Sequence, residues 1–179
     1  SYDLMQLERI VRENAAATAE GAVAEAVQNS PVTLRGSLCI LTGYGRCGSA
    51  IHQCLKNWGC TIVVYDRDEN ACERAKEAAK ICEYKDLSKV LKKAAFLFNT
   101  APSAVWTEGL LEGVPQEVCI LELASMPGGI DRDAADRLGI HINVLPGLPG
   151  RFAPCTSGRL LGEEILKEIE RIIKRECKS

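Results

Sequence analysis

Short apolar runs alternate with helical patterns along the middle of the chain. The runs are rich in Val, Ile, Leu and Phe, which is typical of strands buried on both faces of a parallel sheet. The pattern predicts strands at Leu38–Thr42, Thr61–Tyr65, Ala95–Phe98, Val118–Leu121 and His141–Leu145, and a weaker one near Ile81–Tyr84. It predicts helices at Arg46–Asn57, Glu69–Lys80, Leu87–Lys92 and Asp131–Arg137. Strands and helices that alternate in this way indicate an α/β fold with a doubly wound parallel sheet.

Both ends of the chain have helical patterns. Near the start, Leu4, Leu7, Ile10 and Val11 share one face, and an alanine-rich segment follows with Thr18 as the expected N-cap of a second helix. Residues 157–176 predict an amphipathic helix. Its expected buried stripe comprises Leu161, Ile165, Ile169, Ile172 and Ile173. We therefore expect one helical segment before the strands of the sheet and another after them in the sequence.

Composition narrows the class of protein. The chain is 46% hydrophobic and 26% charged, as in soluble globular domains, and its formal charge of −2 gives no electrostatic reason to bind nucleic acid or an anionic membrane. No apolar run approaches the roughly 20 residues that cross a bilayer. The nine cysteines contain no Cys-x-x-Cys pair. We expect free thiols, no metal site and a cytoplasmic location.

A glycine motif follows the first predicted strand and opens the next helix. Gly43, Gly45 and Gly48 form G-x-G-x-x-G in the strand–turn–helix context of a dinucleotide-binding, Rossmann-type fold. The first glycine allows the tight turn, the second lets backbone approach the pyrophosphate, and the third lets helix pack on strand. The alternative is a structural glycine turn. We expect the whole turn to bind cofactor: Gly43, Tyr44, Gly45, Arg46, Cys47 and Gly48.

The second predicted strand ends in an acid. Asp66 lies 18 residues beyond Gly48, where a carboxylate can accept hydrogen bonds from the ribose hydroxyls of NAD. Arg67 follows and can instead pair with the 2′-phosphate of NADP. Both cofactors therefore remain open, as does the alternative that these residues only form a charged turn.

Ligands of an open parallel sheet bind beyond the carboxyl ends of its strands. The loops that follow the predicted strands are rich in Gly, Pro, Ser and Thr, which is also typical of ordinary turns. The loop after the third long strand adds four expected cofactor contacts: Asn99, Thr100, Ala101 and Pro102.

Five sequence segments together carry a family resemblance. "TAEGA", the glycine turn, "NTAP", "ELASMPGG" and "LPGLPGRFAPCTSGR" resemble the A subunit of dipicolinate synthase over nearly the whole chain. The chain is more distantly similar to the cofactor domains of 2-hydroxyacid dehydrogenases and adenosylhomocysteine hydrolases. The resemblance implies oxidation of dihydrodipicolinate with NAD or NADP in endospore-forming bacteria, together with a flavoprotein-like B subunit of the same synthase.

The resemblance also implies a domain organisation. The family has a further N-terminal domain, and this chain begins at Ser1 rather than Met, so we expect a piece of a longer protein. Residues 1–35 are then a helical connector, residues 36–155 the dinucleotide-binding domain, and residues 156–179 a C-terminal connector helix. We also expect the protein to be an oligomer.

A small cyclic dicarboxylate substrate needs cationic or amide partners. Ser125 with the amides of Gly128 and Gly129 is a candidate anion cradle, and Arg151 or Arg159 a candidate carboxylate ligand. Thr156, a candidate substrate contact, is also expected with Ser157 to cap the last helix, on which Arg159 can simply lie.

No catalytic acid or base is assigned from the sequence. His52 is expected within a helix, facing solvent or a neighbouring helix, and His141 opens a strand away from the crevice. A base then comes from water, the further domain or the partner subunit. Two alternatives to a dipicolinate synthase function stay open: a non-catalytic nucleotide-binding module, and another oxidoreductase of the hydroxyacid dehydrogenase type.

Overall fold

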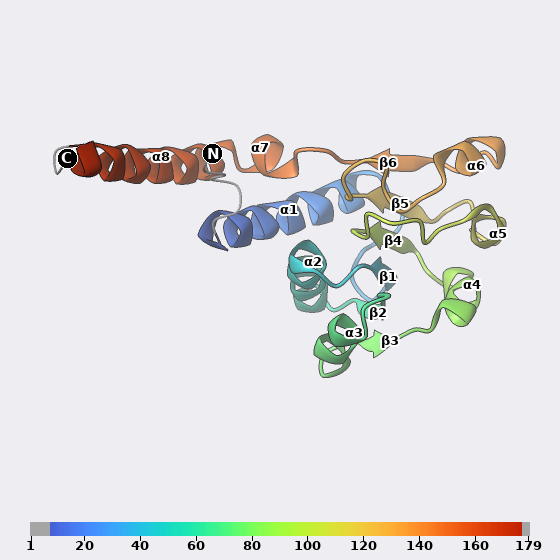
Figure 1. Cartoon of the computed structure of the whole chain (residues 1–179). Helices are drawn as coiled ribbons and strands as arrows, with labels where there is room; N and C mark the ends of the chain where they lie inside the picture. Colours follow the sequence, from blue (N-terminus) through green and yellow to red (C-terminus); the bar gives the residue numbers. More distant parts are fainter. Residues whose placement is uncertain (1–7, 177–179) are drawn as a thin grey trace.

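A computed structural model describes residues 8–176 of the chain (Figure 1). Its centre is a six-stranded sheet whose neighbouring strands are all parallel, in the order β3-β2-β1-β4-β5-β6. The strands are β1 (Leu38–Thr42), β2 (Thr61–Tyr65), β3 (Lys80–Ile81), β4 (Phe96–Asn99), β5 (Cys119–Glu122) and β6 (Ile142–Val144). The chain winds outward from β1 in both directions, which confirms the doubly wound fold and places a topological switch point between β1 and β4.

Helices cover both faces of the sheet (Figure 1). One face carries α1 (Glu8–Gln28), α2 (Arg46–Asn57) and α3 (Glu69–Lys76), and the other carries α4 (Leu87–Leu91), α5 (Glu108–Leu111) and α6 (Arg132–Arg137). The remaining elements are the 3-10 turn η2 (Tyr84–Asp86), α7 (Leu148–Phe152) and α8 (Pro154–Glu176). None of the described helices is both long enough and apolar enough to traverse a bilayer.

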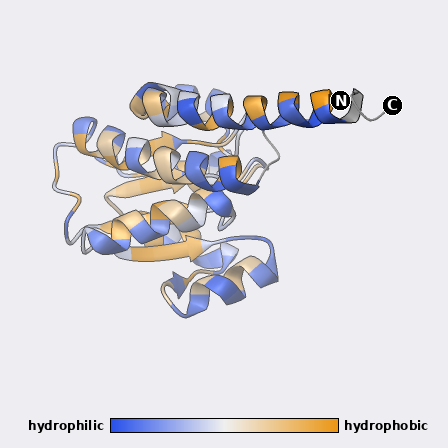
Figure 2. Cartoon of the chain, turned by 90° about the vertical axis from the view of Figure 1, so that its left-hand side faces the viewer, coloured by the Kyte–Doolittle hydropathy of each residue, from blue (hydrophilic) through white to orange (hydrophobic). Residues whose placement is uncertain are grey.

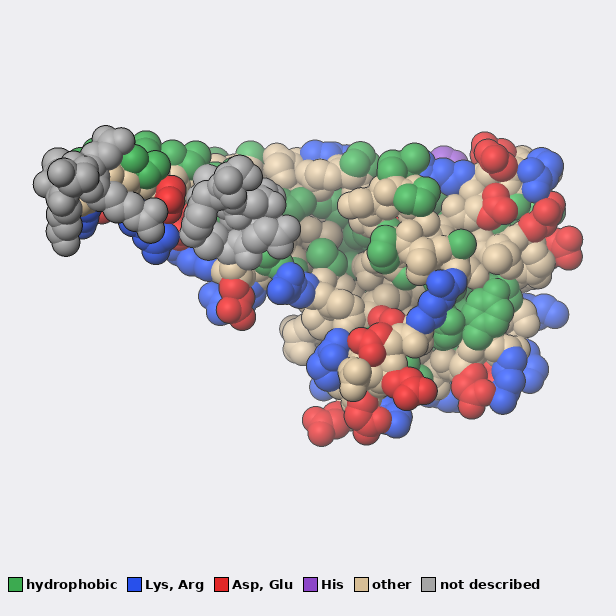
Figure 3. Space-filling model, viewed as in Figure 1, with side chains coloured by type: hydrophobic (Ala, Val, Ile, Leu, Met, Phe, Trp, Pro, Cys, Tyr) green, Lys and Arg blue, Asp and Glu red, His purple; other side chains and the backbone are tan. Residues whose placement is uncertain are grey.

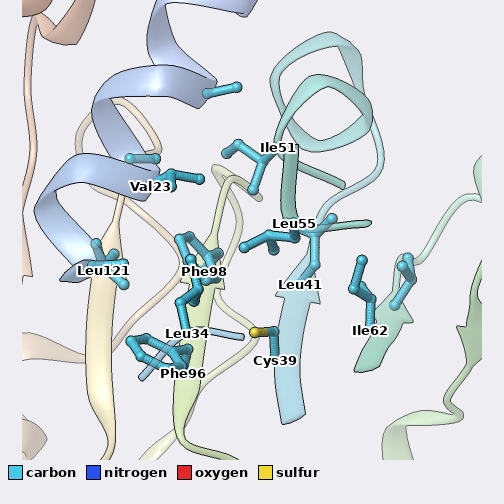
Figure 4. Packing of buried hydrophobic residues seen from close by; sticks show 14 of the residues in the cluster. Val23, Leu34, Cys39, Leu41, Ile51, Leu55, Ile62, Phe96, Phe98 and Leu121 are labelled. Carbon is cyan, nitrogen blue, oxygen red and sulfur yellow. The ribbon is translucent and has the colours of Figure 1, made fainter. Parts of the chain in front are cut away.

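Alternation along the strands builds one core on each side of the sheet. Cys39 and Leu41 of β1 point toward α1 and α2, where they pack in one cluster with Leu55 (Figure 4). Ile40, between them in sequence, points to the opposite cluster with Trp106. All five side chains are inaccessible to solvent, and burying an aliphatic side chain of this size contributes about 1.5–3 kcal/mol.

The N-terminal segment forms one continuous helix rather than two. Thr18 lies in the middle of α1 and its hydroxyl donates a hydrogen bond to the Asn14 carbonyl 2.7 Å away, so the expected N-cap at Thr18 is wrong. The next turns of α1 enter the main core through Ala19, Ala22 and Ala26. Leu4 and Leu7 lie outside the described residues. The segment expected as a connector is thus also part of the core of the domain.

The loop that follows the last predicted strand contains the helix α7, which packs on α1. Leu148 is buried, and a Cβ at Gly21 would lie 2.8 Å from the Phe152 ring, so only glycine lets the two helices approach this closely. Arg151 forms an ion pair with Glu25 of α1 at 2.8 Å. These contacts give the "TAEGA" and "LPGRF" segments a shared structural role.

The last helix extends beyond the domain (Figure 1). Its start is anchored by the buried Leu160 and by Arg9 of α1, whose guanidinium is 2.8 Å from the Glu163 carboxylate. The side chains of the expected stripe instead line an exposed face over α8, so its predicted burial is wrong for this chain (Figures 2 and 3). Of the expected stripe, Leu161 is half-buried, and the exposed members are Ile165, Ile169, Ile172 and Ile173.

Candidate cofactor-binding crevice

A cavity of about 510 Å³ opens at the carboxyl ends of β1, β2 and β4. It lies at the switch point between β1 and β4, and the ends of these three strands with the segments that follow them form its walls together with Val11 of α1. The lining residues are Val11, Gly43, Gly45, Arg46, Cys47, Tyr65, Asp66, Arg67, Thr100, Ala101, Pro102, Ser103 and Val105. Most of the residues predicted to bind cofactor are therefore brought together in one crevice.

The three glycines have distinct environments. Gly43 has a φ of +87°, and a Cβ there would lie 2.5 Å from the Thr100 hydroxyl oxygen and 2.8 Å from the Ala101 nitrogen. A Cβ on Gly48 would overlap the carbonyl oxygen of Gly43. Gly45, at the N-cap of α2, has no atom within 4 Å of its virtual Cβ, so its open side faces the cavity. A ligand can thus approach the backbone at Gly45, whereas the missing side chains of Gly43 and Gly48 allow the close backbone contacts that shape the turn.

Asp66 is hydrogen-bonded to the glycine turn. One carboxylate oxygen accepts from the Tyr44 amide at 2.6 Å, and the other accepts from the Asp68 amide at 2.9 Å. Each oxygen keeps a second lone pair for a ligand hydroxyl. The exposed Arg67 guanidinium donates to the Ala104 carbonyl on the opposite wall. The crevice mouth therefore offers both the acid expected for NAD and the cation expected for NADP.

Tyr44, Gly48 and Asn99 lie behind the crevice surface. The Tyr44 hydroxyl lies 2.8 Å from Nδ1 of His52. His52 is only 2% exposed, so of the two orientations expected for it, toward solvent or toward a neighbouring helix, the first is wrong. Burial lowers the pKa of the His52 imidazole, partly offset by the Ala78 carbonyl. This pair packs the glycine turn against the body of α2.

A buried polar network supports the crevice from below. The Trp106 indole donates to the Thr42 hydroxyl oxygen at 3.2 Å, and the Thr42 hydroxyl donates to the Asn99 side-chain oxygen. The Asn99 amide in turn donates to Glu122 at 2.8 Å and to the Ala101 carbonyl at 3.0 Å. The network links the ends of β1, β4 and β5.

The candidate anion cradle is engaged within the protein. The Gly129 amide donates to the Glu122 carboxylate at 3.0 Å, and the Gly128 amide donates to the Ser125 carbonyl at 2.9 Å. Ser125 itself is exposed. The peptide bond between Met126 and Pro127 in this loop is cis. The amides of the loop thus surround a carboxylate of the chain itself.

The other candidate substrate contacts lie apart from the cavity. Arg151 pairs with Glu25, and Arg159 is exposed on α8. Thr156 and Ser157 do not cap α8, because that helix already begins at Pro154; the Ser157 hydroxyl instead donates to the Pro149 carbonyl at 3.2 Å. Neither arginine is among the residues that line the crevice.

Several functional residues escape sequence reasoning. Val11, Tyr65 and Val105 line the crevice although no motif marks them. The side chain of Val11 comes from α1, and only the tertiary fold brings it there. A better signal exists for Glu122, because a charged residue closes an otherwise apolar strand directly before a glycine-rich loop.

The crevice fits a dinucleotide. Its volume is within the range of about 300–1,000 Å³ usual for ligand sites. The first turn of α2 contains no acid and begins at the open face of Gly45, so helix dipole and free amides favour a diphosphate there. In the described part of the chain, no group of three or more His, Cys, Asp or Glu has the arrangement of a metal site. Its eight described cysteines are free thiols.

Residues 2–113 match the family model of the D-isomer specific 2-hydroxyacid dehydrogenase, NAD binding domain. The chain belongs to this family of NAD(P)-binding dehydrogenase domains.

Among curated proteins, the chain is 31% identical over 98% of its length to the A subunit of dipicolinate synthase from Bacillus subtilis (strain 168). It spans 59% of the length of that relative. The crystal structure of the B. subtilis protein superposes with a TM-score of 0.88 at 30% identity, covering 97% of this chain and 59% of that one. The A subunit from Bacillus halodurans gives a TM-score of 0.86 at 30% identity, over 93% and 57% of the two chains. The chain is thus similar to the A subunit of dipicolinate synthase in sequence and in structure.

Proposed function

We propose that this chain is the cofactor-binding part of the A subunit of a dipicolinate synthase, which oxidises dihydrodipicolinate to dipicolinate during sporulation. The observation that carries the proposal is the crevice, in which an open Gly45, the start of α2 and Asp66 meet in a chain similar to that subunit. In this proposal residues 36–155 form the dinucleotide-binding domain, and residues 1–35 and 156–179 connect it to a further domain.

The crevice residues have separate tasks in this proposal. The amides at the start of α2 and the backbone at Gly45 hold the pyrophosphate, and Asp66 or Arg67 holds the adenosine ribose. Thr100, Ala101 and Pro102 form the opposite wall, toward which the nicotinamide half extends. Neutral backbone and small side chains dominate this wall, so it orients a ring and excludes water rather than exchanging protons.

The chemistry needs positioning above all. When bound, a nicotinamide cofactor supplies the hydride acceptor, so that dihydrodipicolinate loses one hydride and one proton and becomes an aromatic pyridine dicarboxylate. In this proposal Ser125 contacts a substrate carboxylate; in support, it is exposed and follows β5 at the same edge of the sheet as the crevice. Arg151 and Arg159 can reach a carboxylate only if their surroundings change when the further domain is present. The flavoprotein-like B subunit is the proposed partner.

A second candidate function is a non-catalytic nucleotide-binding module. The specific observation in its favour is the position of the two histidines: His52 is buried behind the turn, and His141 lies beside β6 in a separate hollow with Glu112 and Glu117. Among the residues that line the crevice in the described structure, none is a histidine. Another oxidoreductase of the hydroxyacid dehydrogenase type would use a His–acid pair at this place.

Calorimetric titration of the purified chain with NAD, NADP and their reduced forms is the first test. We expect saturable binding of one oxidised–reduced pair. The full-length protein, together with the B subunit, is then assayed with dihydrodipicolinate and the cofactor that binds, by the absorbance of the reduced nicotinamide. Cofactor binding without turnover in that complex favours the non-catalytic module. If the full-length protein binds none of the four nucleotides, the cofactor assignment of this crevice is wrong.

A further inference from the structure

The carboxylate of Glu122 is buried at the end of β5 and surrounded by hydrogen-bond donors. Glu122 is only 1% exposed. One oxygen accepts from the Asn99 side-chain amide at 2.8 Å and from the Ala124 amide at 2.9 Å. The other accepts from the amides of Gly129 at 3.0 Å and Ile130 at 3.2 Å. Two oxygens thus satisfy four N–H donors, which is the full acceptor capacity of an ionised carboxylate.

The loop closes around this carboxylate so tightly that side chains are excluded. A Cβ on Gly128 would lie 2.9 Å from the Glu122 carboxylate, and one on Gly129 would lie 2.5 Å from the Ala101 carbonyl oxygen. The Gly129 carbonyl accepts from the amides of Val105 and Trp106, both at 2.9 Å. The loop after β5 is thereby fastened to the segment that follows β4.

That segment forms one wall of the crevice. Asn99 holds the Ala101 carbonyl at 3.0 Å while it donates to Glu122, and both Ala101 and Val105 line the cavity. Loops normally owe their shape to such local hydrogen bonds, because they lack the ladder of a strand. The position of this wall therefore depends on Glu122.

We propose that Glu122 is a positioning residue for the cofactor crevice: its carboxylate holds the loop after β5 and, through Asn99 and Gly129, the wall formed by residues 100–105. This inference rests on the proposed function of the crevice. Glu122 does not itself touch the cavity, so its effect on a ligand passes through Ala101 and Val105.

A glutamine cannot replace this glutamate. Glu122→Gln keeps the size of the side chain but turns one oxygen into a donor, which would face amides that are themselves donors. Burying an unsatisfied donor is far more costly than losing a solvated one. Glu77→Gln is the matched control, because Glu77 is exposed at the end of α3. Leu91→Ala provides a second control: this fully buried leucine belongs to the core cluster that also contains Val105 and Ile130, but its side chain can make none of the hydrogen bonds around Glu122.

Amide hydrogen exchange by nuclear magnetic resonance, without cofactor, tests the link directly. In the wild type we expect slow exchange at Ala124, Gly129 and Ile130, because each of these amides donates to the buried Glu122 carboxylate. Their acceptor is a side chain and not a neighbouring strand, so their protection reports on Glu122. Glu122→Gln should accelerate exchange at these amides at least tenfold relative to the sheet, whereas Leu91→Ala should not do so selectively. Unprotected amides in the wild type would overturn the inference even if the variant does not fold.

Cofactor titration of the same proteins tests the consequence. We expect Glu122→Gln to bind the preferred nucleotide at least tenfold more weakly, while Glu77→Gln and Leu91→Ala keep the wild-type dissociation constant. A folded Glu122→Gln protein with unchanged exchange and affinity refutes the positioning role. If the wild type binds no nucleotide, the proposed function fails, and the exchange data alone decide whether Glu122 fixes the two loops.

Discussion

Gly45→Ala separates a ligand-contacting glycine from a structural one. Its new methyl group meets no atom within 4 Å, and the φ of −75° suits alanine. Alanine is a poorer N-cap than glycine by about 0.5–1 kcal/mol, but it restricts the unfolded chain and regains about 0.4–1 kcal/mol. The free energy of unfolding should therefore change by less than about 0.5 kcal/mol. The same methyl occupies the open face of the crevice, so we expect cofactor affinity to fall tenfold or more, about 1.4 kcal/mol.

Gly48→Ala should behave in the opposite way. Its methyl would overlap the Gly43 carbonyl oxygen and lie 3.0 Å from the carbonyl carbon, so the turn and α2 must separate. Overpacking against backbone costs about 3 kcal/mol or more, which lowers the melting temperature by roughly 6–12 °C for a chain of this size. Gly109→Ala, at an open position on α5, is the control for both variants.

Thermal melts and calorimetric titrations of the three variants provide the comparison. The reasoning predicts a stable Gly45→Ala protein with weak binding and an unstable Gly48→Ala protein. If Gly45→Ala binds the cofactor as tightly as the wild type, backbone at Gly45 does not contact the ligand, and the phosphate site must lie elsewhere.

Three further predictions concern cofactor choice, pH and ligand protection. Asp66→Ala should weaken NAD binding more than NADP binding, and Arg67→Ala should do the reverse; equal losses in all four titrations would contradict separate ribose roles. Because burial lowers the pKa of His52 below its usual 6.5, stability present above that pH is lost as pH falls toward the folded-state pKa. Between about pH 7.5 and about pH 5.5, the melting temperature of His52→Gln should therefore fall less than that of the wild type. Parallel curves of melting temperature against pH for the two proteins would refute this. Cofactor should slow alkylation of Cys47, which lines the crevice and whose pKa is raised by burial, but should not slow alkylation of the exposed Cys155. Mass spectrometry of the labelled peptides measures both rates. Equal rates at Cys47 with and without ligand would show that the cofactor does not bind in this crevice.

The sheet could be predicted from sequence because each buried strand needs an apolar run. The predictions for β1 and β2 match the structure at both ends, and those for β4, β5 and β6 differ by one residue at each end. The weaker strand expected near Ile81–Tyr84 is wrong beyond Ile81, because β3 covers only Lys80–Ile81 and Tyr84 begins the 3-10 turn η2. The helix expected at Glu69–Lys80 ends at Lys76, since β3 takes up Lys80 and Ile81. The short helices α5 and α7 were not predicted, because Gly109 in α5 and Pro149 and Gly150 in α7 are residue types typical of turns.

The glycine turn and Asp66 could be placed because their spacing follows from local geometry. Contacts that depend on tertiary packing could not: Arg151 pairs with Glu25, 126 positions away in sequence, and the stripe on α8 finds no cover in the described chain. "SMPGG" was recognised as a special loop, but its amides were assigned to a ligand. Sequence shows that a loop has amides to offer; it does not show that Glu122 already accepts them.

The carboxylates and the crevice surface at this edge of the sheet have different roles. The carboxylates of Glu122 and Asp66 accept hydrogen bonds from backbone amides of the loops, and the crevice surface is mostly backbone and small side chains. Four N–H donors occupy the Glu122 carboxylate, so it has no free acceptor site for a substrate. Acid–base chemistry then has to come from outside these residues, whereas orientation of a planar ring is what a rigid wall provides. The crevice is therefore built to fix a cofactor in place, and the loops that Glu122 holds decide how well it does so.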